Sequence, residues 1–118
     1  MDRTQLSQEV TQLHAHICSA IADPNRILLL YALAERPRTV NDLSDEVGTN
    51  QPATSRHLKI LREAGLVLSE RQGASVEYRL ADMRLIDALN LLRLVLHDRL
   101  SYNASLVEGE LPISEPES

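Results

Sequence analysis

The sequence predicts a mainly α-helical fold that carries one two-stranded β-hairpin. Over most of the chain, apolar residues recur at spacings of three and four, the period of one helix face. Between residues 66 and 80 the period changes to two, around a turn that contains glycine. Only 3% of the 118 residues are aromatic, so leucine, isoleucine, valine and alanine must build the core, which favours helices.

Two helices are expected in the first third of the chain. The first is predicted from about Leu6 to Ile21. Its apolar face consists of Leu6, Val10, Leu13, Ile17 and Ala20. The second opens with Asp23-Pro24, an N-cap followed by proline at the first helical position, where the missing N–H costs nothing. It is expected to end near Arg36-Pro37.

Two shorter helices follow, joined by a tight turn. Thr39 is the expected N-cap of the third helix, with Asp42 three residues on in the capping-box arrangement. Gly48 stands where a left-handed residue ends that helix. Asn50 is the expected cap of the fourth helix, which ends at Gly65. Two helices joined by Gly48-Thr49-Asn50 are typical of a helix-turn-helix.

A β-hairpin is predicted directly after the fourth helix. Its strands are expected at Leu66–Glu70 and Val76–Leu80, with a turn at Gln72–Ser75. A leucine-rich last helix follows from about Asp82 to Tyr102. Four helices, two strands and one helix, in that order, predict a winged helix-turn-helix whose hairpin is the wing.

Charge is distributed unevenly along the chain. We expect one domain over residues 1–104 and an acidic, disordered tail over 105–118. Four glutamates lie in that tail, and without them the net charge would be −1 instead of −5. Between residues 52 and 62 no acid accompanies Arg56, Lys59 and Arg62. Such a cluster is either a solvated helix face or a surface for a polyanion, and its place in a helix-turn-helix favours the second.

Other classes of protein find little support. No apolar run approaches the ~20 residues of a membrane span, and the N-terminus lacks the pattern of a secretory signal. A single cysteine, Cys18, fits a reducing compartment, so a cytoplasmic protein is expected. The chain has no glycine-rich phosphate loop, and Ser55 and His57, two residues apart on a helix, face different directions. We therefore expect neither enzymatic activity nor a cofactor.

The fourth helix is the predicted reader of double-stranded DNA, because the second helix of a helix-turn-helix enters the major groove. Gln51, Thr54 and Arg56 are the candidates for base contact, since these side chains match adenine, thymine and guanine edges. Ser55 and Lys59 suit phosphate oxygens. The full predicted DNA-binding set is Asn50, Gln51, Thr54, Ser55, Arg56, His57, Lys59 and, on the wing, Arg71, Gln72 and Ser75.

Two of these assignments have alternatives. His57 either contacts phosphate or packs between helices. Arg79 either extends the wing's contact with DNA or pairs across the strands with Glu70 or Glu77.

The residues resemble the ArsR/SmtB, or arsenic-repressor-type, family of bacterial winged-helix regulators over about residues 17–100. The resemblance rests on Ala22–Arg26 (ADPNR), on Gln51–Val67 (QPATSRHLKILREAGLV) and on the wing Arg71–Tyr78 (RQGASVEY). It implies a homodimer whose first and last helices form the interface, an operator of twofold symmetry, and repression that an effector relieves.

The last helix independently predicts a partner subunit, because its apolar stripe is wider than one small domain needs. The alternative is a wide core face. The expected interface residues are Leu13, Ile17, Leu85, Leu89, Leu92 and Leu96.

The family's usual metal ligands are missing. Thr39–Leu43, at the start of the third helix, contains no cysteine. On the last helix the matching positions are Asp82, Arg84, Val95 and Asp98, of which two offer no ligand. No metal site is therefore expected, and the effector stays unidentified.

One cluster leaves an alternative open. His14 and Cys18 share a helix face, and His97 of the partner subunit would complete a zinc-type site with them. Otherwise Cys18 is a small buried hydrophobe.

The leading hypothesis is a sequence-specific transcriptional repressor. A winged-helix protein-interaction module without an operator is the alternative, and a polar fourth helix argues against it.

Overall fold

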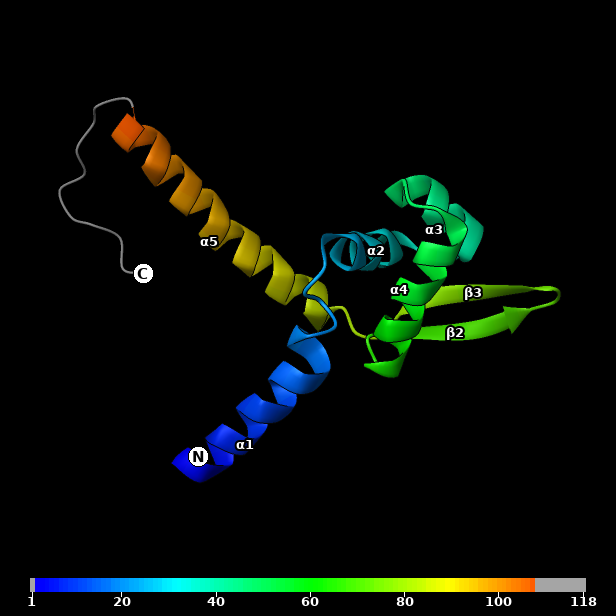
Figure 1. Cartoon of the computed structure of the whole chain (residues 1–118), viewed down its shortest axis with the longest axis horizontal. Helices are drawn as coiled ribbons and strands as arrows, with labels where there is room; N and C mark the ends of the chain where they lie inside the picture. The colour runs from blue at the N-terminus through cyan, green and yellow to red at the C-terminus, as the bar shows by residue number, and fades with distance from the viewer. Residues whose placement is uncertain (1, 108–118) are drawn as a thin grey trace. The chain divides into compact units, whose positions relative to one another are not determined.

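The computed structural model describes residues 2–107. The chain forms two compact units, one ending at Met83 and one beginning at Arg84, and each is described by itself. The elements, labelled in Figure 1 where space allows, are α1 (Arg3–Leu13), η1 (His14–Cys18), α2 (Pro24–Glu35), β1 (Arg38–Thr39), α3 (Val40–Val47), α4 (Gln51–Glu63), β2 (Val67–Gln72), β3 (Ser75–Leu80) and α5 (Arg84–Val107). The predicted order is confirmed, with β1 as an added strand. Of the described helices, none combines the length and apolarity needed to cross a bilayer.

The first predicted helix consists of two parts. Helix α1 begins three residues earlier than predicted and gives way to η1, a π-helical turn in which the amide of Ser19 donates to the carbonyl of His14 at 3.1 Å. The apolar stripe of α1 lies open to solvent in the single chain: Leu6, Val10 and Leu13 are 48–51% exposed.

The predicted caps of the next three helices are confirmed. The side chains of Asp23, Thr39 and Asn50 accept hydrogen bonds from amides two or three residues on, at 2.8, 3.3 and 2.8 Å. Gly48 ends α3 with φ +80°, the left-handed conformation that favours glycine. These local interactions set where each helix starts and how the chain turns between α3 and α4.

The core of the first unit lies between α2, α3, α4 and the sheet. It is aliphatic, as the composition predicted. Its fully buried apolar side chains are Leu29, Leu30, Leu43, Leu58, Leu61 and Val67. Contacts of α2 with α3 and α4, and of α4 with β2, close this core.

The sheet has three antiparallel strands in the order β1-β3-β2. The hairpin extends one or two residues closer to its turn than predicted and leaves only Gly73-Ala74 as the loop, with Gly73 at φ +64°. Strand β1 pairs Arg38 with Tyr78. The sequence did not predict β1, because two residues are too few to show a strand period.

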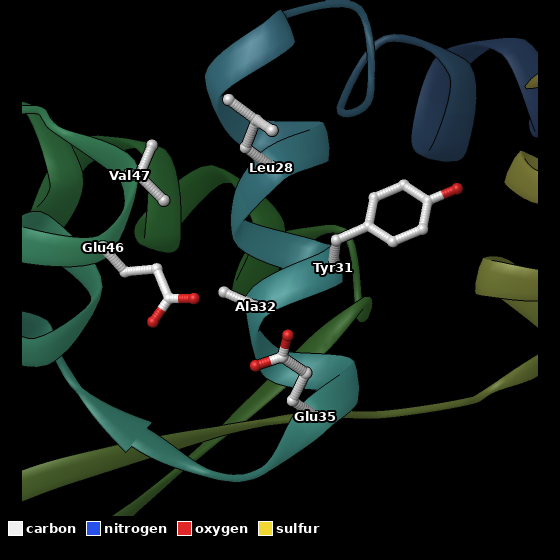
Figure 2. Close-up of a pocket in the computed structure, with 6 residues that line it drawn as sticks. All are labelled: Leu28, Tyr31, Ala32, Glu35, Glu46 and Val47. Atoms are coloured by element: carbon white, nitrogen blue, oxygen red, sulfur yellow. The ribbon is translucent and has the colours of Figure 1, made fainter.

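Arg38 joins three elements of this unit. Its residue is 3% exposed, and its guanidinium lies 2.5 Å from Glu35 Oε1 of α2 and also pairs with Glu46 of α3. Figure 2 shows the two carboxylates turned toward each other beside Ala32, whereas Tyr31 points away from them. Arg38 therefore ties β1 and α2 to the first helix of the helix-turn-helix.

The second unit is helix α5. It continues to Val107, beyond the predicted domain boundary at residue 104. Residues 108–118, most of the predicted acidic tail, lie outside the described residues.

Candidate nucleic-acid interface

Helix α4 presents one polar face to solvent and packs the other into the core. The reason is its period: Thr54, Leu58 and Leu61, at spacings of four and three, are fully buried. The exposed residues of the helix are Gln51, Pro52, Ser55, Arg56, Lys59, Ile60, Arg62 and Glu63. Predicted site residues Gln51, Ser55, Arg56 and Lys59 thus lie on the accessible face.

That accessible face is cationic. Arg56, Lys59 and Arg62 are exposed along it, and the only acid of the helix is Glu63, at its C-terminal end. Arginine offers paired donors that match a guanine edge or a phosphate, and lysine offers a point charge. The face therefore suits a polyanion that carries both phosphates and hydrogen-bonding edges.

The predicted base contact by Thr54 is wrong. The side chain is 0% exposed, and its hydroxyl donates to the carbonyl of Asn50 at 2.9 Å and lies 2.9 Å from the hydroxyl of Thr49. The spacing of Thr54 from Leu58 and Leu61 was the signal that places it on the core side. Threonine tolerates that side because a carbonyl one turn back accepts from its hydroxyl.

Two other predicted contacts already have protein partners. The side-chain oxygen of Asn50 accepts from the amide of Ala53 at 2.8 Å, so this residue caps α4. His57 is half-buried, and its Nδ1 lies 3.2 Å from Nη1 of Arg26 on α2. Of the two alternatives for His57, the structure shows the packing contact.

The wing residues Arg71, Gln72 and Ser75 are all exposed, but they do not share one face of the hairpin. Directly opposed residues on antiparallel strands point to the same side. Arg71 lies opposite Val76 and so on the side of the sheet that faces the core, whereas Gln72 lies opposite Ser75 on the other side. The wing therefore offers two separate groups of polar side chains.

Neither glutamate considered for Arg79 lies directly opposite it; Glu70 is its diagonal neighbour on the same side of the hairpin. The register places Leu68 opposite Arg79, and Glu70 opposite Glu77. Two carboxylates therefore face each other across the hairpin, on the side that also carries Gln72 and Ser75.

The start of α4 and the wing line one surface hollow. It is lined by Thr39, Val40, Asn41, Gln51, Ala74, Ser75 and Val76. Gln51 and Ser75, far apart in sequence, thus share one depression, together with Thr39 and Asn41, which the sequence did not single out as binding residues. The pairing of Thr39 with Glu77 produces this neighbourhood, because β1 carries the start of α3 to the hairpin.

The segment around Cys18 differs from one expectation. The thiol is exposed in the single chain rather than buried. Within the described residues, no group of three or more His, Cys, Asp or Glu side chains is placed to hold a metal ion. The zinc-type alternative at His14, Cys18 and His97 of the partner subunit draws on a second chain and stays a prediction.

A cationic helix that follows a tight turn, with an antiparallel hairpin beside it, defines a winged helix-turn-helix protein. The chain belongs to the arsR family of bacterial regulatory proteins, whose sequence model matches residues 23–69. The predicted family is thereby confirmed.

Individual relatives support the assignment. The chain is 42% identical over 78 residues to the transcriptional repressor SmtB of Mycobacterium tuberculosis. The aligned residues make up 66% of this chain and 58% of SmtB. The chain therefore spans less than two thirds of that repressor's length. It is 37% identical over 84 residues to the regulator NmtR of the same species, covering 71% of this chain and 69% of NmtR.

A solved structure agrees with the fold. The homodimeric winged helix-turn-helix DNA-binding domain Mb0332 of Mycobacterium bovis is 26% identical to this chain and has a TM-score of 0.69. The match covers 85% of this chain and 91% of that domain.

Proposed function

We propose that this protein is a transcriptional repressor that binds double-stranded operator DNA as a homodimer and is released by an effector. The observation that carries the proposal is the exposed, cationic face of α4 beside the wing. Its relative SmtB is a transcriptional repressor, which supports the direction of regulation. The proposed function includes no catalytic activity. It also implies that the protein is cytoplasmic, where its operator DNA lies.

The residues of α4 divide into two groups by chemistry. Gln51 and Arg56 are exposed and carry planar groups that bond in pairs to adenine and guanine edges. Ser55 and Lys59, also exposed, suit phosphate oxygens, which position a protein without reading sequence. The wing extends the contact along the DNA backbone through Arg71, Gln72 and Ser75.

Homodimer formation is supported by apolar side chains that the single chain leaves open. On α5, Leu92 and Leu96 are 60% and 56% exposed, which is costly for leucine in water. Leu89, also in the expected interface set, is 5% exposed in the single chain. The whole set, Leu13, Ile17, Leu85, Leu89, Leu92 and Leu96, stays a prediction. The homodimeric state of the M. bovis relative supports the same arrangement.

The protein-interaction alternative has weaker support. A docking helix would expose several large apolar side chains, whereas Ile60, at 40% exposure, is the one large apolar residue on the solvent side of α4. Its neighbours on that face are polar or cationic.

The test is selection of bound duplexes from a random-sequence DNA library, followed by fluorescence anisotropy on the enriched sequence. We expect enrichment of a site with twofold symmetry. We also expect the affinity to fall with salt, with a logarithmic slope of about −0.9 for each phosphate contacted. An unenriched library, together with no salt-dependent binding to any duplex, would reject the proposal.

A further inference from the structure

Arg26 of α2 hydrogen-bonds to two segments of the first unit that are distant from each other in sequence. Its Nε donates to the carbonyl of Ala20 at 2.6 Å, and its Nη2 to the carbonyl of Ser19 at 3.5 Å. Its Nη1 donates to Nδ1 of His57 at 3.2 Å. One guanidinium thus connects the chain just after η1 to the middle of α4.

Helix α2 itself does not account for this arginine. Arg26 lies in the first turn of α2, where the helix dipole disfavours a cation, and that turn contains no acid. The carbonyl oxygens of Ser19 and Ala20, which follow η1, carry the opposite partial charge. The tertiary contacts therefore explain the residue better than its own helix does.

The contact also determines which ring nitrogen of a neutral His57 carries the proton. All five guanidinium N–H groups are donors and none accepts, so the Nδ1 that faces Arg26 must be the unprotonated nitrogen. In a neutral imidazole the proton is then on Nε2. The two ring nitrogens point in different directions, so the Nε2–H is directed away from Arg26.

We propose that Arg26 is a positioning residue of the DNA-binding surface, which holds His57 as the Nε2–H tautomer so that this N–H donates to a DNA phosphate. The inference rests on the proposed function and deepens it. His57 keeps its predicted phosphate contact, but through the one nitrogen that the packing contact leaves available.

The first experiment needs no DNA. Long-range ¹H–¹⁵N NMR of the ¹⁵N-histidine-labelled protein distinguishes the two neutral tautomers by the shifts of both ring nitrogens. The wild type is expected to show the Nε2–H pattern for His57. R26K, which keeps the charge but loses the forked geometry, is expected to show averaging between tautomers. An averaged or Nδ1–H pattern in the wild type would overturn the inference.

The second experiment uses a random-sequence duplex of about 30 base pairs, long enough for two half-sites one helical turn apart. H57N keeps an acceptor near the position of Nδ1 and lacks the distal N–H. H57N is expected to melt like the wild type but to bind about fivefold more weakly, the effect of one hydrogen bond. R26K is expected to bind only about twofold more weakly than the wild type, because averaging leaves the Nε2–H tautomer populated for part of the time.

The double variant R26K/H57N is expected to bind no more weakly than H57N, since Arg26 acts through the tautomer of His57 and H57N has no imidazole left to position. Additive losses, or undiminished binding by H57N, would overturn the inference. R56A is the control: it is expected to lose selective binding while the NMR pattern of His57 stays unchanged. Failure of the wild type to bind any duplex would reject the proposed function, and the NMR result would still decide the role of Arg26 in the tautomer.

Discussion

The hydroxyl of Thr54 lies 2.9 Å from the hydroxyl of Thr49 and donates to the carbonyl of Asn50 at the same distance. Thr49 and Asn50 belong to the turn, and Thr54 to the first turn of α4. The recognition helix is thereby tied to the turn before it through a fully buried side chain. Thr54, which the sequence predicted as a base contact, instead holds the helix-turn-helix together.

Replacement of Thr54 by valine tests this structural role. T54V keeps the shape of the side chain and removes the hydroxyl, which leaves the Asn50 carbonyl and the Thr49 hydroxyl without this partner. We expect the free energy of unfolding in urea to fall by about 1 to 2 kcal/mol. The protein's preference for the bases of the selected duplex should not change. S55A, one residue on and exposed, is the control and should unfold like the wild type. A changed base preference at full stability would contradict this role.

Replacement of Gln51 or Arg56 by alanine tests base reading. Both side chains are exposed and absent from the core, so Q51A and R56A should melt like the wild type. Each should lose about 1 to 3 kcal/mol of discrimination between the selected duplex and a scrambled one, measured by anisotropy. Retained selectivity in both variants would show that another surface reads the bases.

K59A is the matched comparison for these variants. Lys59 is exposed on the same face but carries no planar group for a base edge. We expect K59A to weaken binding to the selected and scrambled duplexes equally and to reduce the salt slope by about one. A selective effect of K59A would assign Lys59 to base reading.

Replacement of Arg38 by alanine tests how α2 and α3 are held. R38A removes a buried guanidinium and leaves the carboxylates of Glu35 and Glu46 without the cation between them. The side chains of Glu35 and Glu46 are 65% and 44% exposed, so water relieves part of the repulsion. We expect a loss of about 2 to 4 kcal/mol in the free energy of unfolding. R36A, two residues away and exposed, should change it by less than about 0.5 kcal/mol. Equal stability of the two variants would show that Arg38 is dispensable.

A charge on the apolar stripe of α5 tests the dimer. L92E or L96E places a carboxylate where the proposed interface buries leucine from both subunits. We expect the dimer dissociation constant, measured by sedimentation velocity, to rise by at least roughly 100-fold, since burial of each leucine contributes about 1.5 to 3 kcal/mol. S101E adds the same charge half a turn around the helix from Leu92 and should remain dimeric. Dimers unchanged in L92E and L96E would place the interface elsewhere.

The structural elements were predictable because the signals that define them are local. The caps at Asp23, Thr39 and Asn50 act on amides two or three residues away, and Gly48 needs only its own backbone conformation. The hairpin follows from alternation and a glycine turn. The exposed face of α4 was predictable in part, since Arg56 and Lys59 avoid its apolar positions.

Contacts between distant residues were not predictable in the same way. The two-residue strand β1 exists only because Arg38 meets Tyr78, 40 positions along the numbering, and no local period announces it. The contact of Arg26 with His57, 31 residues apart, likewise depends on how α2 packs on α4. Sequence spacing limits such pairs but does not select among them.

The sequence by itself determined the order of the elements, the helix-turn-helix and its wing, because hydrophobic period, caps and turn residues act over a few positions. The tertiary structure alone decided which nitrogen of His57 is available, since the packing of α2 on α4 brings Arg26 to its Nδ1. Burial depends on what a side chain meets from other elements, and that requires the folded chain.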